Sequence, residues 1–152
     1  MAPPDPYQQV PATPLWLGTG GLIPFMLLAG SLWLAPAPYQ PMLADWLRSY
    51  AAVILSFIGA VHWGFAMLHP KLDEHERGTV MAWSVVPALV GWIGLIVPLR
   101  HGLVFIAAMF IIQFSMDRAF ARRFAVPPWY LRLRSGLTAV VVVCLGLAVV
   151  HG

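Results

Sequence analysis

The stretch SYAAVILSFIGAVHWGFAML, residues 49–68, decides the fold class. It contains twenty residues and no Asp, Glu, Lys or Arg. A helix rises about 1.5 Å per residue, so a segment of this length crosses about 30 Å of hydrocarbon. The stretch therefore predicts a transmembrane helix with an ionisable side chain, His62, inside it.

The composition and the other apolar segments extend this prediction to the whole chain. Of its 152 residues, 60% are hydrophobic and 10% are charged, whereas soluble domains have about 45–50% and about 25%. Four further segments approach the length of a span: Leu15–Ala35, Thr79–Pro98, His101–Phe120 and Gly136–Val150. The last is short, so we expect its helix to begin earlier, at Tyr130 or Leu131.

The expected fold class is an all-α polytopic membrane bundle with five transmembrane helices. Residues 15–152 are expected to form a single five-helix transmembrane domain. The proline-rich residues 1–14, MAPPDPYQQVPATP, are expected to be a disordered leader. No Lys or Arg precedes Arg48, so we expect no cleaved signal peptide, which would begin with a basic region.

The Lys and Arg residues predict the orientation, because cytoplasmic loops of membrane proteins are enriched in them. One side of a five-span topology carries seven: Lys71, Arg77, Arg118, Arg122, Arg123, Arg132 and Arg134. The other side carries only Arg48 and Arg100. We therefore expect a multi-pass protein of the bacterial inner (cytoplasmic) membrane, with its N-terminus inside and its C-terminus outside. The net charge of +3 then reflects topology, and no nucleic-acid partner is expected.

The side of the helix on which His62 lies is predicted to face protein. Steps of three and four residues back from His62 reach small and polar side chains: Gly59, Ser56 or Leu55, Ala52 and Arg48. Such stripes allow close helix contact. Counting depth along the spans places three polar residues of the third and fourth segments at the same level, so the predicted intramembrane polar cluster is His62, Ser84, Gln113 and Asp117.

The role of this cluster stays open at the level of sequence. It is consistent with a polar clamp in which a neutral His62 ring is hydrogen-bonded to a neighbouring helix. Ionisable residues within membranes also mark proton or solute pathways, and haem or quinone binding is a third interpretation. No second histidine lies at the depth of His62, since His101 and His151 are at the outer side and His69 and His75 at or beyond the inner boundary. We therefore expect no cofactor and no bound metal.

The motif DRAFARRFAVPPWYLRLR, residues 117–134, is predicted to lie at the membrane surface. Arginines suit the headgroup region, Trp and Tyr suit the interfacial belt, and two prolines interrupt the helix. The predicted interface residues are Arg118, Arg122, Arg123, Trp129, Tyr130, Arg132 and Arg134. They would bind anionic lipid headgroups, or they would form a docking surface for a partner protein.

Motifs for catalysis are weak in this sequence. The charged segment HPKLDEHERG, residues 69–78, is typical of a solvated loop. GTGG, residues 18–21, lacks the spacing and the preceding strand of a nucleotide-binding loop. Cys144 is the single cysteine and lies in an apolar segment, so it supports neither a disulfide nor a cysteine-based metal motif. Enzyme is the class that we expect least.

Three motifs taken in order, YAAVILSFIGAVHWGFAM, SVVPALVGW and PPWYLRLRSGLT, carry a resemblance. From about Trp16 onward the chain resembles a family of small bacterial integral membrane proteins of unknown function, itself similar to the mitochondrial transmembrane protein 69. The resemblance implies an inner-membrane protein and brings no enzymatic activity. Its motif positions in this chain are His62, Trp63, Gly64, Pro87, Trp92, Asp117, Trp129, Tyr130, Arg132 and Arg134.

The first functional hypothesis is a non-catalytic accessory, assembly or scaffold protein of a respiratory or photosynthetic inner-membrane complex. Its expected partners are membrane lipids and that larger complex. The second hypothesis is a small transporter or proton-conducting bundle that uses His62 and Asp117. The third is a haem- or quinone-binding redox membrane protein.

Overall fold

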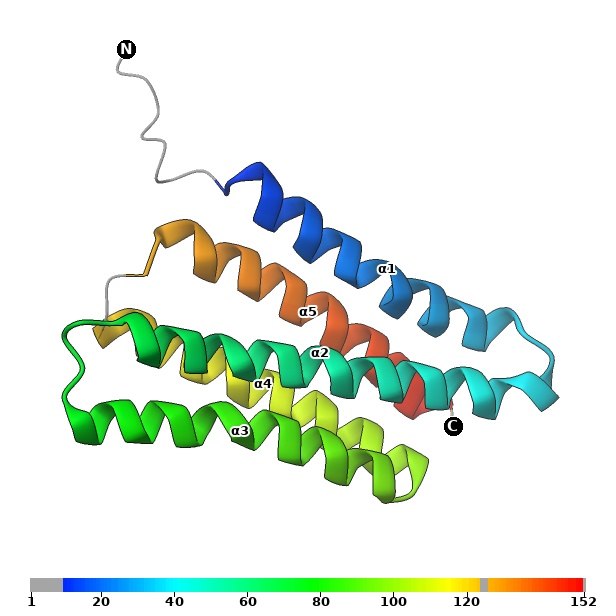
Figure 1. Cartoon of the computed structure of the whole chain (residues 1–152). Coiled ribbons are helices and arrows are strands. Elements are labelled where there is room, and N and C mark those ends of the chain that lie inside the picture. Colours follow the sequence, from blue (N-terminus) through cyan, green and yellow to red (C-terminus); the bar gives the residue numbers. More distant parts are fainter. Residues whose placement is uncertain (1–9, 124–125, 152) are drawn as a thin grey trace, which may run out of the picture.

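The chain folds into five long helices and one short 3-10 helix in a computed structural model that describes residues 10–123 and 126–151 (Figure 1). In chain order they are α1 (Ala12–Leu34), η1 (Ala37–Tyr39), α2 (Gln40–Leu68), α3 (Glu74–Ile96), α4 (Leu99–Arg123) and α5 (Pro128–His151). All five α-helices are long and apolar enough to cross a membrane, and no strand occurs in the described ranges. The predicted fold class, a five-helix transmembrane bundle, is confirmed.

The start of α2 differs most from the prediction. The helix begins at Gln40 instead of Ser49, so Arg48 lies within a helix and not in a loop. Its charge is tolerated there because it pairs with Asp45 one turn earlier. The Arg48 guanidinium also donates to the Val97 carbonyl at 3.0 Å, which satisfies a group left free at the end of α3.

The first and the last helix, α1 and α5, both begin earlier in the sequence than predicted. α1 begins at Ala12, so the last residues of the expected leader are helical, and residues 1–9 lie outside the described residues. α5 begins at Pro128, which suits the first helical position because proline needs no hydrogen-bond acceptor there. Most of the predicted basic loop between α4 and α5 is therefore helix.

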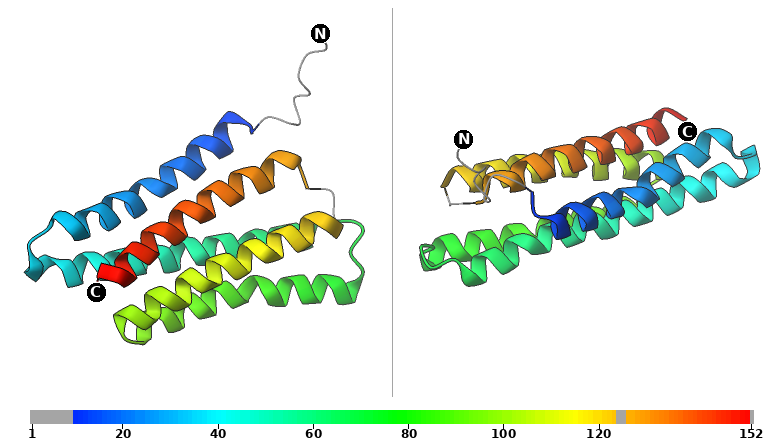
Figure 2. Two further views of the ribbon diagram at one scale, coloured as in Figure 1. Left: turned by 180° about the vertical axis from the view of Figure 1, so that it is seen from behind. Right: turned by 90° about the horizontal axis from the view of Figure 1, so that it is seen from above.

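α2 lies in the middle of the bundle and contacts all four other α-helices. α3 packs against α2 and α4, while α5 packs against α4 and α1 (Figures 1 and 2). The buried core is apolar and centres on Phe25, Leu55, Ile106, Phe110 and Leu145. Each helix also presents exposed apolar side chains outward, for example Leu27, Phe57, Leu89, Ile111 and Val143, as expected of surfaces that face lipid.

Glycine permits close contact between α2 and α3. A Cβ atom on Gly59 of α2 would lie 2.7 Å from the Ser84 carbonyl oxygen of α3. Gly91 of α3 meets the backbone of Ala52 in the same way, at 3.3 Å. The predicted stripe of small residues thus faces α3, and it brings α2 and α3 together at the level of His62.

The two ends of the bundle differ in charge. One end carries the starts of α1, α3 and α5 and the ends of α2 and α4 (Figure 1); we call it the arginine-rich end. It holds Lys71, Arg77, Arg118, Arg122, Arg123, Arg132 and Arg134, whereas the opposite end holds Arg48 and Arg100. Which end faces the cytoplasm stays a prediction.

Candidate functional site

A chain of polar side chains crosses the interior near the arginine-rich end. α2 contributes His62, α4 contributes Gln113 and Asp117, α3 contributes Trp83, and α5 contributes Arg134. His62, Gln113 and Asp117 are 4%, 0% and 2% exposed. Four helices thus place polar groups in contact inside an otherwise apolar bundle. We call these five residues the polar chain.

The direction of the hydrogen bonds in this chain follows from Trp83. The indole Nε1–H can only donate, and it donates to Oε1 of Gln113 at 3.1 Å. The NH2 group of Gln113 therefore faces His62, whose Nδ1 lies 3.0 Å from Nε2 of Gln113. Because Gln113 donates in this contact, Nδ1 of His62 accepts and carries no proton. The neutral ring then bears its proton on Nε2.

The protonated side of the His62 ring faces a carboxylate. Nε2 of His62 lies 3.4 Å from Oδ1 of Asp117, and Nε of Arg134 donates to Oδ2 of Asp117 at 2.7 Å. The Asp117 side chain is 1% exposed and that of Arg134 is 11% exposed. Since the two opposite charges are adjacent, the polar chain with a neutral His62 carries no net charge. Phe120 covers the ring of His62, with 4.9 Å between their centroids.

The structure brings together three of the four residues predicted for the polar cluster. The exception is Ser84, which is buried as expected but whose hydroxyl donates to the Met81 carbonyl of its own helix at 2.6 Å. Ser84 contributes its backbone to the site, because its carbonyl oxygen lies against Gly59 of α2. The Ser84 hydroxyl thus bonds within α3 and not to the other three predicted residues, because depth along a helix does not determine where a hydroxyl finds its acceptor.

Arg134 and Tyr130 were predicted for the membrane surface, and the structure places them in the bundle instead. Arg134 pairs with Asp117, and Tyr130 lines two cavities between the helices. Trp83 was not predicted at all. The sequence holds a signal for each of Arg134 and Trp83. A carboxylate at the depth of Asp117 needs a cation, which indicates a nearby arginine such as Arg134. Trp83 is the only indole in the predicted third span at the depth of Gln113.

The remaining predicted interface residues lie at the arginine-rich end. Arg118, Arg122, Arg123 and Arg132 are exposed, and Trp129 is half-buried. Arg123 forms an ion pair with Glu76 of α3 at 3.0 Å. Arg77 donates to the Ala66 and Leu72 carbonyls and so closes the turn between α2 and α3. Part of the basic charge therefore has a structural role at this end.

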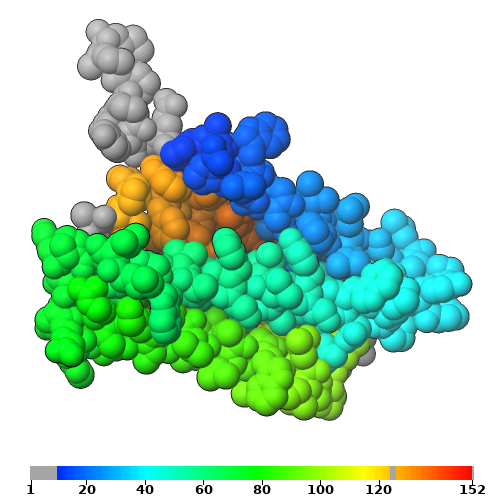
Figure 3. All heavy atoms as spheres, in the orientation of Figure 1, coloured from blue at the N-terminus to red at the C-terminus, as the bar shows by residue number. Residues whose placement is uncertain are grey.

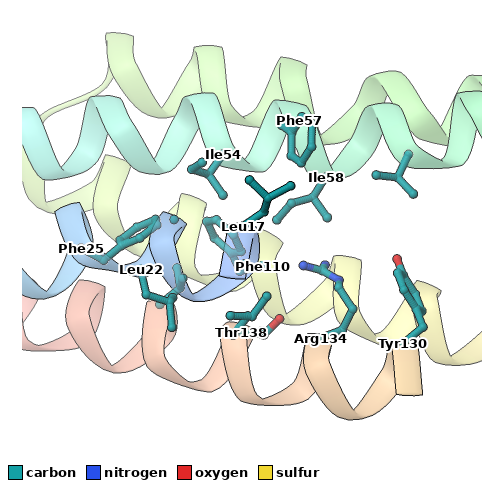
Figure 4. A pocket seen from close by; sticks show the side chains of 15 residues that line it. Leu17, Leu22, Phe25, Ile54, Phe57, Ile58, Phe110, Tyr130, Arg134 and Thr138 are labelled. Atoms are coloured by element: carbon teal, nitrogen blue, oxygen red, sulfur yellow. The ribbon is translucent and has the colours of Figure 1, made fainter. Parts of the chain in front are cut away.

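Two cavities adjoin the polar chain. One of about 120 Å³ touches His62, Asp117 and Tyr130. The other, of about 220 Å³, lies between α1, α2, α4 and α5, and Arg134 and Tyr130 form part of its wall (Figure 4). Among residues 10–123 and 126–151, no three His, Cys, Asp or Glu side chains gather as a metal site.

Comparison with known proteins identifies the family to which the chain belongs. The family described as "Protein of unknown function (DUF3429)" matches residues 10–150. Transmembrane protein 69 of Xenopus tropicalis is 34% identical over 140 residues, which are 89% of this chain and 53% of that protein. The chain thus spans about half the length of the curated relative that it matches. No solved structure matches it.

Proposed function

Because the chain belongs to the DUF3429 family of proteins of unknown function, we propose its role from its own geometry. That role is a non-catalytic accessory, assembly or scaffold protein of a larger respiratory or photosynthetic complex. Its five apolar helices and its transmembrane relative make it a multi-pass membrane protein. The bacterial inner membrane is the location that we propose for it.

The single observation that carries this proposal is the direction of the hydrogen bonds from Trp83 to His62. A histidine that relays protons must gain and lose them at its ring nitrogens. A second proton on His62 would place Nδ1–H against the NH2 group of Gln113. Turning the Gln113 amide would instead place its NH2 group against the indole N–H of Trp83. Both arrangements oppose two donors, so the polar chain favours a fixed clamp over turnover.

A clamp of this kind holds the helices in a fixed arrangement. The groups that act on other molecules are then expected on the surface of the bundle. Exposed Arg118, Arg122 and Arg132 form a basic edge at the arginine-rich end. Each arginine near an anionic membrane surface contributes about 1 kcal/mol of attraction. The same edge complements an acidic segment of a partner protein. We propose that it orients the chain at the headgroups and docks it to the larger complex.

Native electrophoresis of gently solubilised membranes tests the accessory role. The tagged full-length chain should migrate with a large complex. The triple variant Arg118→Gln, Arg122→Gln and Arg132→Gln should shift to a small species. Arg100→Gln, which removes an exposed charge at the opposite end, is the matched control and should stay with the complex. Migration of the wild-type chain only as a small species in several mild detergents would contradict the proposal.

A proton-conducting bundle is the second candidate function. The observation in its favour is the cavity of about 120 Å³ that touches both His62 and Asp117. Purified protein in liposomes that carry a pH-sensitive dye separates the two candidates. Under the clamp proposal, wild-type and His62→Gln liposomes leak protons at the same rate as empty ones. A flux that disappears in His62→Gln would establish the second candidate instead.

A further inference from the structure

The cavity between α1, α2, α4 and α5 has two buried donors with no acceptor. Nη2 of Arg134 and Oγ1 of Thr138 are buried and have no hydrogen-bond partner in the protein. Both residues belong to α5, are one helical turn apart and line the same cavity (Figure 4). Buried donors in folded proteins are normally paired. Their position therefore points to a ligand that brings acceptor oxygens.

The charge of the site restricts that ligand. The Arg134 guanidinium is already balanced by the Asp117 carboxylate, 2.7 Å away. An anionic headgroup would add an uncompensated negative charge within an apolar bundle, which is unfavourable at membrane depth. A neutral carbonyl oxygen accepts the same hydrogen bonds without that charge. The acceptor is thus expected to be uncharged.

The shape and lining of the cavity restrict the ligand further. Its volume is about 220 Å³, below the roughly 300–1,000 Å³ typical of pockets for drug-sized ligands, so it suits one ring and not a phospholipid headgroup with its chains. Four aromatic side chains contribute to the wall: Phe25, Phe57, Phe110 and Tyr130. Aromatic walls favour a flat ring through stacked and edge contacts.

The cavity also has an apolar side from which a tail can leave. α1 diverges from α2 toward the N-terminus of α1 (Figure 1), and in the space-filling view α5 is visible between them (Figure 3). Leu17 of α1 and Phe57 of α2 line the cavity and are 73% and 70% exposed. This side of the bundle faces lipid when the helices span a membrane, so a hydrophobic tail would extend into the bilayer.

We propose that this cavity binds the ring of a membrane quinone, an uncharged ring with carbonyl oxygens on an apolar tail. Arg134 and Thr138 donate to the carbonyl oxygens, and the aromatic side chains pack on the ring. The proposal concerns binding and includes no electron transfer. It goes beyond the accessory role and is measured on the isolated chain, so loss of complex association leaves it unaffected.

The test measures binding of a short-tailed benzoquinone to the purified full-length chain in detergent. Equilibrium dialysis should show saturable binding, and bound quinone should raise the melting temperature. A benzene ring with the same tail and no carbonyl oxygens should bind at least about tenfold more weakly, since it satisfies neither donor. Native mass spectrometry with quinone and phospholipid together identifies which of the two occupies the chain.

Two variants with matched controls locate the site. Thr138→Val keeps the shape and removes a hydroxyl that has no protein partner, so it folds and should weaken binding about two- to tenfold. Thr19→Val is its control, because the Thr19 hydroxyl is exposed and bonded to its own helix. Gly21→Leu should abolish binding, since Gly21 lines the cavity and no atom lies closer than 4.0 Å to a Cβ built there. Gly20→Leu, on an open surface, is its control.

Three results would overturn the proposal. One is equal affinity for the quinone and the carbonyl-free analogue. The second is binding that neither Thr138→Val nor Gly21→Leu weakens relative to its control, while the variant keeps its melting temperature without ligand. The third is a phospholipid that stays bound and that excess quinone does not displace.

Discussion

Nε1 of Trp83 lies 3.1 Å from Oε1 of Gln113, so a residue of α3 determines which end of a buried amide on α4 faces α2. The other end of that amide meets Nδ1 of His62 at 3.0 Å. A donor with no acceptor capacity, the indole, therefore sets the proton position on a ring two contacts away. The polar chain continues from His62 through Asp117 to Arg134, and it joins four helices.

Replacement of His62 distinguishes a hydrogen-bonding role from mere space filling. His62→Gln keeps polar groups and a similar size, so it should lower the melting temperature in detergent only slightly. His62→Leu leaves the NH2 group of Gln113 without an acceptor and should cost about 1–2 kcal/mol of stability. His75→Leu, at an exposed position, is the control. Equal melting temperatures for the Gln and Leu variants would contradict the clamp.

Removal of Arg134 should be the most destabilising single change in the polar chain. Arg134→Met leaves the Asp117 carboxylate buried without its cation, and loss of one partner of a buried pair costs about 3–5 kcal/mol. The double variant Arg134→Met and Asp117→Asn removes both charges and should recover most of the lost stability. Arg118→Met, which replaces an exposed arginine at the same end of the bundle, is the control. A double variant no more stable than Arg134→Met alone would show that the pair is not the cause.

The contact between α2 and α3 predicts opposite effects for two glycines of α2. Gly59→Ala places a Cβ 2.7 Å from the Ser84 carbonyl oxygen, so the helices must separate, at a cost of about 1–3 kcal/mol. Gly64→Ala meets no atom within 4 Å and should be neutral or slightly stabilising, because alanine favours a helix. Thermal melts of both variants check this. Similar effects would mean that the two helices are not held at the described distance.

The spans and part of the polar chain were predictable from the sequence, for physical reasons. Long uncharged segments predict helices because a bilayer leaves few alternatives, and a shared depth places His62 beside Gln113 and Asp117. The start of α2 was not predictable by hydropathy, since Asp45 and Arg48 count as polar until their pairing is known. Trp83 and Arg134 were missed because their roles depend on the rotation of α3 and on the point at which α5 begins.

The orientation in the membrane remains a prediction, with seven basic residues near one end and two near the other. A reporter fused after Gly152 should be active only on the outer side. One inserted near Asp73, in the turn between α2 and α3, should be active only on the inner side. His151, the last residue of α5, and Asp73 lie at opposite ends of the bundle, so activity of both reporters on the same side would contradict a five-span topology.

The state of the His62 ring tests the central claim most directly, and nitrogen NMR of protein labelled with 15N-histidine measures it. The signal that disappears in His62→Gln identifies His62 among the five histidines. At neutral pH we expect a neutral ring with an unprotonated Nδ1 that accepts a hydrogen bond and a protonated Nε2. Trp83→Phe, which frees Gln113 to turn, should allow the other tautomer to appear. A wild-type ring that is protonated on Nδ1, alone or together with Nε2, would contradict the claim that Trp83 fixes His62 through Gln113.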